Sequence, residues 1–175
     1  MRLETERLVI RNWRADDLEA MFAMYSNPNV TRFLGQGSTW EDREITQTRL
    51  NRIMERDAEL GDFGFWACTL KDFDQPMGAA LLLPIQHSPG YEDYEKEFEI
   101  GWHLDEPHWG KGLGTEIAIA MRDLGLQQHE KLIAIAYPEN VASLRIMQKL
   151  GMREEGATDR FFGIPNLLHY SISRS

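Results

Sequence analysis

The sequence predicts an α/β fold in which one mixed, mostly antiparallel sheet is flanked by helices. Two observations predict it. The apolar runs at 63–70 and 77–83 are separated by the turn-forming residues Asp72–Gln75, so they are expected to form a hairpin. The runs at 98–104 and 131–137 are instead separated by a helical segment, which is typical of a crossover between parallel strands. Hairpins and crossovers in one chain indicate a mixed sheet.

Three elements are expected before the first hairpin. Leu8–Asn12 predicts a strand. The helix after it is expected to stop before Pro28, because the residue ahead of a proline avoids the helical conformation. Its apolar face is formed by residues three and four apart, namely Leu18, Met21, Phe22 and Tyr25. Ser38–Glu41 fits a capping box, so a longer helix is expected from there to about Leu60, with Gly61 as its stop.

Strands and helices are expected to alternate in the second half of the chain. A helix after residue 112 presents one apolar face, formed by Leu113, Ile117, Ala120, Met121 and Leu124. The nearly continuous apolar run Lys131–Tyr137 is typical of a strand covered on both faces. Asn140 is a favourable N-cap for the next helix, and Gly151 is the matching stop. A final hairpin is expected within Phe161–Ser173, with its turn at 163–166.

Length and composition favour a single domain spanning residues 1–175. The 42% of apolar residues are enough for a core. The formal net charge of −9 argues against a nucleic-acid partner and suits a cationic substrate such as an amine. No apolar run approaches the ~20 residues that cross a membrane, and the charged first residues lack a signal-peptide pattern, so a cytoplasmic protein is expected. The single cysteine, Cys68, allows neither an internal disulfide nor a CxxC metal site.

The stretch from Trp109 to Glu116 carries the strongest functional signal. It places Gly110, Gly112 and Gly114 at alternate positions between a strand-like run and a helix. Glycine lets a ligand approach the backbone, and a helix N-terminus offers unpaired N–H groups to an anion. A phosphate-binding loop is therefore expected, with a tight structural turn as the alternative. The spacing fits neither the GxxxxGK[ST] phosphate loop nor a GxGxxG dinucleotide loop after the first strand.

Three further segments accompany this loop, namely Glu99–Leu104, Asn140–Ser143 and Lys149–Met152. Together with the loop they resemble the GNAT superfamily of N-acetyltransferases. Trp109–Gly114 is similar to the acetyl-CoA signature of that family, [Q/R]xxGx[G/A], with Trp109 in place of the usual Gln or Arg. This replacement and the opening segment at 3–11 resemble the branch that includes the ribosomal-protein alanine N-acetyltransferases.

The resemblance implies a GNAT-like fold, acetyl-CoA as co-substrate without a metal, and a splayed strand pair that exposes backbone groups to the pantetheine arm. Leu104 would lie on the strand that faces the pantetheine, and Asn140 and Ser143 would contact the cofactor from the next helix. Backbone amides of the glycine loop would hold the diphosphate, and these belong to Trp109, Gly110, Lys111, Gly112, Leu113, Gly114 and Thr115.

Acetyl transfer to an amine needs a base for the ammonium proton and a proton for the departing thiolate. Glu99 is the candidate base because it occupies the glutamate position of the Glu-Ile-Gly-aromatic pattern of the family, and Glu97 would point the same way on a regular strand. Many GNAT members carry a tyrosine acid where this chain has Met147, which cannot donate a proton. The resemblance suggests the Ser143 hydroxyl as the acid instead. The structural alternatives are solvated glutamates and a serine that serves the first helical turn.

Structural roles are favoured for the remaining polar and aromatic candidates. His103 and His108 flank the loop and are able to act as acid–base groups, but surface or packing roles are favoured. Cys68 is expected to be a buried hydrophobe. Three aromatic side chains are candidates for an acceptor pocket or the core, namely Phe33, Trp40 and Trp66. The acidic segment at 91–99 is either a solvated loop or a rim that attracts a cationic amine or a basic peptide.

The sequence thus predicts an acetyl-CoA-dependent N-acetyltransferase that transfers the acetyl group directly to a primary amine in a ternary complex. The acceptor is expected to be a protein N-terminus or a small-molecule amine, and the protein is expected to be a monomer or a homodimer. One alternative is a non-catalytic acyl-CoA-binding or sensor module, which the absence of a tyrosine at position 147 leaves open. A nucleotide-binding regulatory domain is the other.

Overall fold

The computed structural model describes residues 1–61, 63–93 and 96–174, which build an eight-stranded sheet. The strands are β1 (Arg2–Glu4), β2 (Leu8–Arg11), β3 (Gly64–Leu70), β4 (Phe73–Pro84), β5 (Phe98–Leu104), β6 (Lys131–Ala136), β7 (Arg153–Thr158) and β8 (Leu167–Ser173). Their order across the sheet is β1-β2-β3-β4-β5-β6-β8-β7. Neighbouring strands are antiparallel except β5 and β6, which are parallel. The predicted mixed, mostly antiparallel sheet is confirmed.

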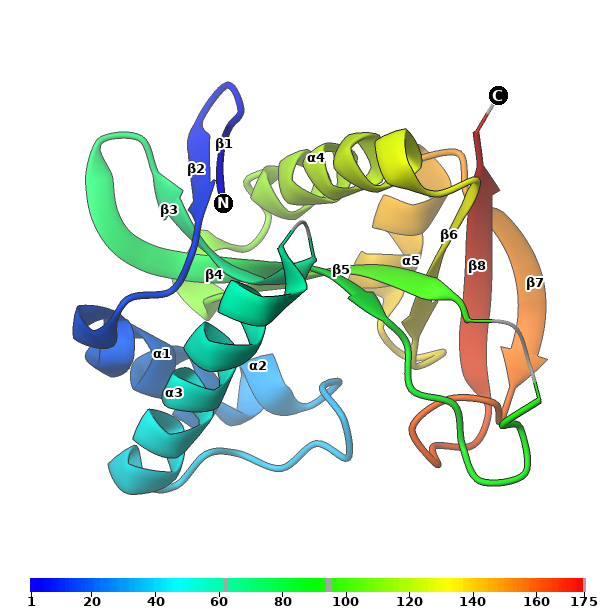
Figure 1. Cartoon of the computed structure of the whole chain (residues 1–175), viewed down its shortest axis with the longest axis horizontal. Coiled ribbons are helices and arrows are strands. Elements are labelled where there is room, and N and C mark those ends of the chain that lie inside the picture. The colour runs from blue at the N-terminus through cyan, green and yellow to red at the C-terminus, as the bar shows by residue number, and fades with distance from the viewer. Residues whose placement is uncertain (62, 94–95, 175) are drawn as a thin grey trace.

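Helices cover both faces of this sheet. They are α1 (Leu18–Ser26), α2 (Pro28–Thr31), α3 (Arg43–Leu60), α4 (Leu113–Gln128) and α5 (Val141–Lys149), with short 3-10 turns η1 (Ala15–Asp17) and η2 (Glu106–His108). Figure 1 shows α4 on one side of β4 and β5, and α1 to α3 gathered on the other side. Among the described residues, no helix combines the length and the apolar character needed to cross a membrane.

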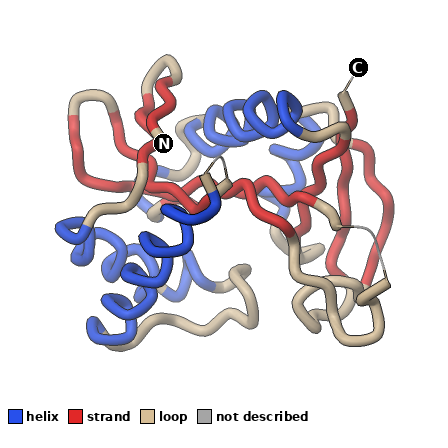
Figure 2. The backbone as a smooth tube through the Cα atoms, in the orientation of Figure 1, coloured by secondary structure: helices blue, strands red, loops and turns tan. Residues whose placement is uncertain are grey.

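The first residues of two helices are set by local hydrogen bonds. Asn140 caps α5 as predicted, because its Oδ1 accepts from the Ser143 N–H at 3.2 Å. The capping box predicted at Ser38–Glu41 is wrong: α3 begins at Arg43, and the Asp42 carboxylate accepts from the Glu44 N–H at 2.7 Å. The Trp40 N–H is bonded to the Tyr25 carbonyl at 3.0 Å, which holds the preceding segment outside the helix. Figure 2 shows this segment as a long loop between α2 and α3.

The two edge regions of the sheet differ from the sequence prediction. The last hairpin pairs β8 with β7, which begins at Arg153, whereas the prediction placed its first strand near Phe161. Phe161 instead forms an isolated bridge with His87, in the loop between the two strands. The polar edge strands β1 and β7 lack the apolar alternation that identifies a strand with one buried face, so the sequence did not predict them.

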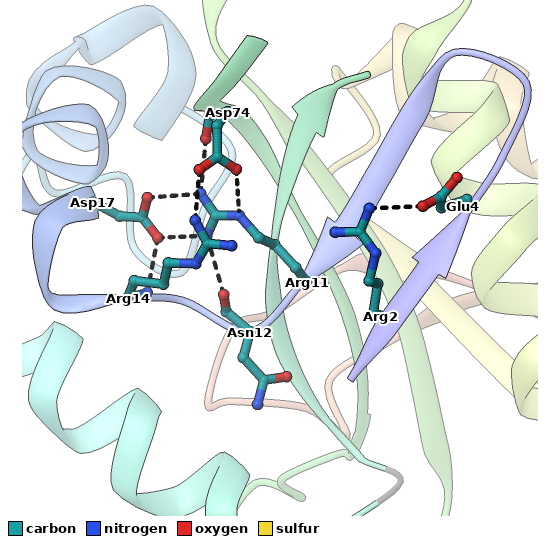
Figure 3. A network of polar contacts seen from close by, with 7 residues as sticks. All are labelled: Arg2, Glu4, Arg11, Asn12, Arg14, Asp17 and Asp74. Atoms are coloured by element: carbon teal, nitrogen blue, oxygen red, sulfur yellow. Dashed lines mark hydrogen bonds and ion pairs between the residues drawn. The ribbon is translucent and has the colours of Figure 1, made fainter. Parts of the chain in front are cut away.

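A buried ion pair fastens the start of the chain to the sheet. The Arg11 guanidinium donates two hydrogen bonds to the Asp17 carboxylate, at 2.7 and 2.9 Å, and both side chains are about 5% exposed or less. Arg11 also donates to the side chain and the carbonyl of Asp74 on β4 (Figure 3). The bond to Asp17 raises the pKa of Arg11. Strand β2, turn η1 and strand β4 are thereby joined at one point.

β5 and β6 lie together only near their first residues. Glu99 is paired with Ile133, and no further pair joins these two strands in the described sheet. β5 keeps its pairing with β4 over its whole length, from Phe98 opposite Pro84 to Leu104 opposite Gly78. The edge of β5 that faces β6 is therefore open after Glu99, which is the splayed arrangement that the sequence resemblance implied.

Candidate active site

A cavity of about 260 Å³ opens where β5 and β6 separate. Residues 99–103 of β5 form one wall, and the end of β6 with the start of α5 forms the opposite wall. The loop after α2 contributes Phe33–Gly35, and the loop before β8 contributes Phe162 and Ile164. The cavity brings together segments that are far apart in the sequence, including the predicted catalytic residues Glu99 and Ser143.

Glu99 lines this cavity from the first part of β5. Burial raises the pKa of its carboxyl group from 4.5 to about 8, because few solvent molecules stabilise the charged form there. Apolar neighbours such as Leu81 and Ile100 line the same cavity. When it is ionised, a carboxyl group with a pKa near 8 is a stronger base than an ordinary glutamate, so it is better able to take a proton from an ammonium group.

Glu97 occupies a different environment. Its carboxylate lies 3.2 Å from Nη1 of Arg160 and 3.4 Å from Nε2 of His87, and it is not part of the cavity wall. Glu97 precedes β5, and its carboxylate is held by Arg160, so of the two predicted acids Glu99 lines the cavity and Glu97 does not. Of the predicted acidic rim at 91–99, Tyr94 and Glu95 lie outside the described residues.

His103 lines the cavity four residues after Glu99 on the same strand. Its Nδ1 lies 2.9 Å from the hydroxyl of Tyr25, which is 2% exposed on α1. The Tyr25 ring meets the imidazole edge-on, and Phe65 packs against it from β3. Burial lowers the pKa of His103 to about 4, so the imidazole is neutral at physiological pH. His103 therefore packs against aromatic side chains, as predicted, and also lines the cavity.

The opposite wall carries the residues predicted to contact the cofactor. Asn140 and Ser143 both line the cavity, and the side-chain Oδ1 of Asn140 caps α5 by accepting from the Ser143 N–H. Met147 lies one turn further along α5 and is 1% exposed. At this wall Ser143 therefore supplies a hydroxyl group near the separated strands, whereas Met147 supplies only an apolar surface.

The glycine loop folds as a tight turn directly before α4. Gly110 and Gly112 adopt positive φ angles of 72° and 79°, which glycine tolerates better than other residues. α4 begins directly after Gly112, so the N–H groups of Leu113, Gly114 and Thr115 have no partner within the helix. These amides and the positive end of the helix dipole fit a phosphate group. The alternative of a structural turn is compatible with the same backbone.

Close contacts hold this loop against the sheet. The Trp109 indole N–H donates to the Leu104 carbonyl at 2.8 Å, which ties the loop to the end of β5. A Cβ atom on Gly114 would lie 3.1 Å from Ile146 of α5, so glycine allows the two helices to approach closely. The loop is therefore positioned by β5 on one side and by α5 on the other.

Arg7 braces the same loop, although the sequence analysis gave it no role. Its guanidinium donates to the Lys111 carbonyl at 2.9 Å and forms an ion pair with Glu116 of α4 at 2.7 Å. The Arg7 backbone N–H also donates to Glu116, at 2.8 Å. Arg7 thereby fixes the loop to the start of α4, and the Glu116 carboxylate balances its charge.

The other predicted candidates differ in where they lie relative to the core and the cavity. Cys68 and Trp66 are buried in the core, and burial raises the pKa of the Cys68 thiol. Trp40 stacks on Tyr25 with ring centroids 4.4 Å apart and does not line the cavity. Phe33 does line it, contrary to the favoured core role. His108 belongs to η2, outside the cavity.

Tyr137 and Phe162 are cavity residues that the sequence analysis missed. The Tyr137 hydroxyl donates to the Gly35 carbonyl at 2.6 Å, which closes the cavity between β6 and the loop after α2. Phe162 adopts a φ angle of 56°, uncommon for a residue with a side chain, and reaches the cavity from the loop before β8. Both contacts depend on the tertiary fold, so no local sequence pattern predicts them.

Comparisons with known proteins agree with this geometry. Residues 7–153 match the family model described as an acetyltransferase (GNAT) domain. The uncharacterized N-acetyltransferase YnaD of Bacillus subtilis is 30% identical over 159 residues, which cover 89% of this chain and 85% of that protein. The chain therefore belongs to the GNAT family of acetyltransferases, and it is an acetyltransferase.

Solved structures show the same fold. A GNAT-family acetyltransferase from Bacillus anthracis superposes with a TM-score of 0.78 at 24% identity, covering 99% of this chain and 98% of that one. The ribosomal-protein-S5-alanine acetyltransferase from Vibrio fischeri superposes with a TM-score of 0.73 at 18% identity, covering 99% and 96%. At these identities the likeness concerns the fold alone.

Proposed function

We propose that this protein transfers the acetyl group of acetyl-CoA directly to a primary amine, with both substrates bound at once. The observation that carries the proposal is the cavity at the separated strands, which Glu99 faces from one wall and Ser143 from the other. Acetyl-CoA, the co-substrate of the family, supplies an activated thioester carbonyl. The glycine loop lies at the N-terminus of α4, where its free amides suit the diphosphate of that molecule.

The two walls then have different chemical roles. Glu99 accepts the ammonium proton, directly or through water, so that the amine nitrogen can form a bond to the acetyl carbon. As the carbon–sulfur bond breaks, the Ser143 hydroxyl supplies a proton to the sulfur and regains the proton that the new amide nitrogen releases. Open backbone N–H groups of β5 near Leu104 polarise the carbonyl oxygen.

The acceptor is an amine of a protein N-terminus or of a small molecule. Support for a protein acceptor comes from the likeness to the ribosomal-protein alanine acetyltransferase fold. The cavity supports an amine attached to an apolar group, because aromatic and aliphatic side chains form most of its wall, including Phe33, Leu81 and Phe162.

Release of the free CoA thiol, measured over a panel of peptides with free N-termini and small amines, tests this function. We expect amine-dependent thiol release, and we expect Glu99→Gln to lower kcat at least about 100-fold, as removal of a general base does. Both proteins should bind CoA equally in calorimetry. Tight CoA binding without turnover of any amine would instead support the non-catalytic acyl-CoA-binding module.

A further inference from the structure

We propose that His103, held by Tyr25, presents its Nε2–H to the acceptor cavity and selects amines that carry a hydrogen-bond-accepting oxygen at a short distance from the amino group. This inference rests on the proposed function of the cavity and adds a specificity-determining residue to it. Glu99 would bind the amino group, and His103 would bind the oxygen.

The hydrogen bond between Tyr25 and His103 fixes which imidazole nitrogen carries the proton. The Tyr25 hydroxyl is buried, and His103 Nδ1 is the partner of that hydroxyl among the described contacts. If Nδ1 donated, the hydroxyl hydrogen of Tyr25 would be left buried without an acceptor, which is costly. The hydroxyl therefore donates to Nδ1, and the proton of the neutral imidazole is on Nε2.

The orientation of the ring is fixed as well. Tyr25 contacts the imidazole edge-on at 84°, with ring centroids 5.9 Å apart, and Phe65 lies 5.7 Å from it. Trp40 stacks on Tyr25 with ring centroids 4.4 Å apart, which holds the tyrosine ring in place. The aromatic neighbours therefore limit rotation of His103, and its N–H group can be a directed donor.

The shape of β5 separates the two polar groups by an apolar surface. Glu99, Gly101 and His103 are alternate residues, so they share one face of the strand. Gly101 has no side chain, and a Cβ atom there would lie 3.0 Å from the side chain of Leu81. Leu81 leans over this position and lines the cavity between Glu99 and His103. An acceptor with an amino group, a short apolar segment and an oxygen fits this order.

Matched pairs of acceptors test the selection. The probes are ω-amino amides with different numbers of methylene groups and the n-alkylamines of the same length. For each pair, the ratio of kcat/KM for the amide to kcat/KM for the alkylamine is compared between variants. The different intrinsic pKa values of the two amines cancel in this comparison, because they are the same for every variant.

We expect the wild-type ratio to exceed that of His103→Phe by about tenfold for the best amide, as for the loss of one hydrogen bond. His103→Gln, which keeps an N–H donor near the position of Nε2, should retain part of the preference. Tyr25→Phe should lower the ratio by a smaller factor, because the imidazole loses its fixed orientation. Tyr170→Phe is the matched control: its hydroxyl belongs to a side chain of equal burial and donates to Glu154, outside the cavity.

A second measurement does not depend on turnover. Long-range proton–nitrogen NMR spectra of the wild-type protein should show His103 as the Nε2–H tautomer between pH 6 and 8, and Tyr25→Phe should change that signal. The Nδ1–H tautomer in the wild type would overturn the inference. An unchanged acceptor ratio in His103→Phe, with amines still acetylated, would overturn it too. Lack of turnover with every amine would overturn the proposed function, while the NMR result still decides the tautomer.

Discussion

Glu99 and His103 line one cavity, and burial moves their pKa values in opposite directions. The pKa of Glu99 rises to about 8 and that of His103 falls to about 4, so both groups favour their neutral forms at pH 7. An ammonium group that enters this site loses much of its hydration and is best stabilised by an ionised Glu99. Substrate binding and ionisation of Glu99 are thus expected to be coupled.

The raised pKa of Glu99 also predicts how stability depends on pH. In the unfolded chain Glu99 ionises near 4.5, whereas in the folded protein it resists ionisation up to about pH 8. Its contribution to stability is therefore fully present below pH 4.5 and is lost as the pH rises toward 8, by at most about 1.4 kcal/mol per pH unit. Water that enters the cavity reduces this slope.

Glu99→Gln removes this titration, so the variant should gain stability relative to the wild type as the pH rises. Thermal unfolding of both proteins at pH 5 and pH 8 measures the effect. We expect the variant to unfold at a clearly higher temperature than the wild type at pH 8, with a smaller difference at pH 5. An equal difference at both pH values would show that Glu99 ionises normally in the folded protein.

At the scale of elements, the start of the chain depends on one buried charge pair. Replacing Arg11 by methionine leaves Asp17 buried without its partner, so we expect a loss of about 3–5 kcal/mol in the free energy of unfolding. Urea unfolding measures this loss, provided that the dependence of the free energy of unfolding on urea concentration, the m value, is unchanged. Arg2→Met is the control, because Arg2 and Glu4 form an exposed pair that should contribute less than about 1 kcal/mol (Figure 3).

A loss of similar size in both variants would show that burial does not distinguish the two ion pairs. The double variant Arg11→Met with Asp17→Leu provides a further check. Because the double variant removes both charges, its loss in the free energy of unfolding should be smaller than the sum of the losses in the two single variants.

Elements with strong local signals were predictable, and those held by distant contacts were not. The helix start at Asn140 and the stop at Gly61 follow from the residues themselves. By contrast, α3 begins after Asp42 because the Trp40 N–H is bonded to Tyr25, a contact between two separate segments. Strand β7 is a polar edge strand whose pairing with β8 alone identifies it.

The same division applies to the candidate site. Glu99, Asn140, Ser143 and the glycine loop belong to sequence motifs, so they were named from the sequence. The roles of Tyr25 and Tyr137 arise from hydrogen bonds to distant residues. Tyr25 lies 78 positions from its partner His103, and Tyr137 lies 102 positions from its partner Gly35. Spacing along the chain cannot reveal such pairs, although they help to shape the cavity.

At the scale of the whole molecule, the site lies where the two parts of the sheet meet. One parallel pair, Glu99 with Ile133, joins β5 to β6 in the described sheet. Along the chain, the glycine loop and α4 connect the end of β5 to the start of β6. A ligand that contacts β5, α4 and α5 together bridges both parts of the fold. Its binding should therefore stabilise the molecule as a whole and not only one loop.

Acetyl-CoA at 100 times its Kd should raise the free energy of unfolding by about 2.7 kcal/mol, which corresponds to a rise in Tm of about 5–10 °C for a chain of this size. Gly112→Val should abolish the rise, because valine is strained at a φ of 79° and crowds the anion-binding turn. Gly90→Val, at an exposed glycine with a φ of 89° away from the loop, should keep this rise in Tm.

Thermal unfolding with CoA, acetyl-CoA, ATP and NAD measures these shifts. Equal shifts with ATP or NAD would assign the loop to nucleotides in general, whereas a selective shift with the CoA species means that the pantetheine arm, between the separated strands, is part of what the protein recognises.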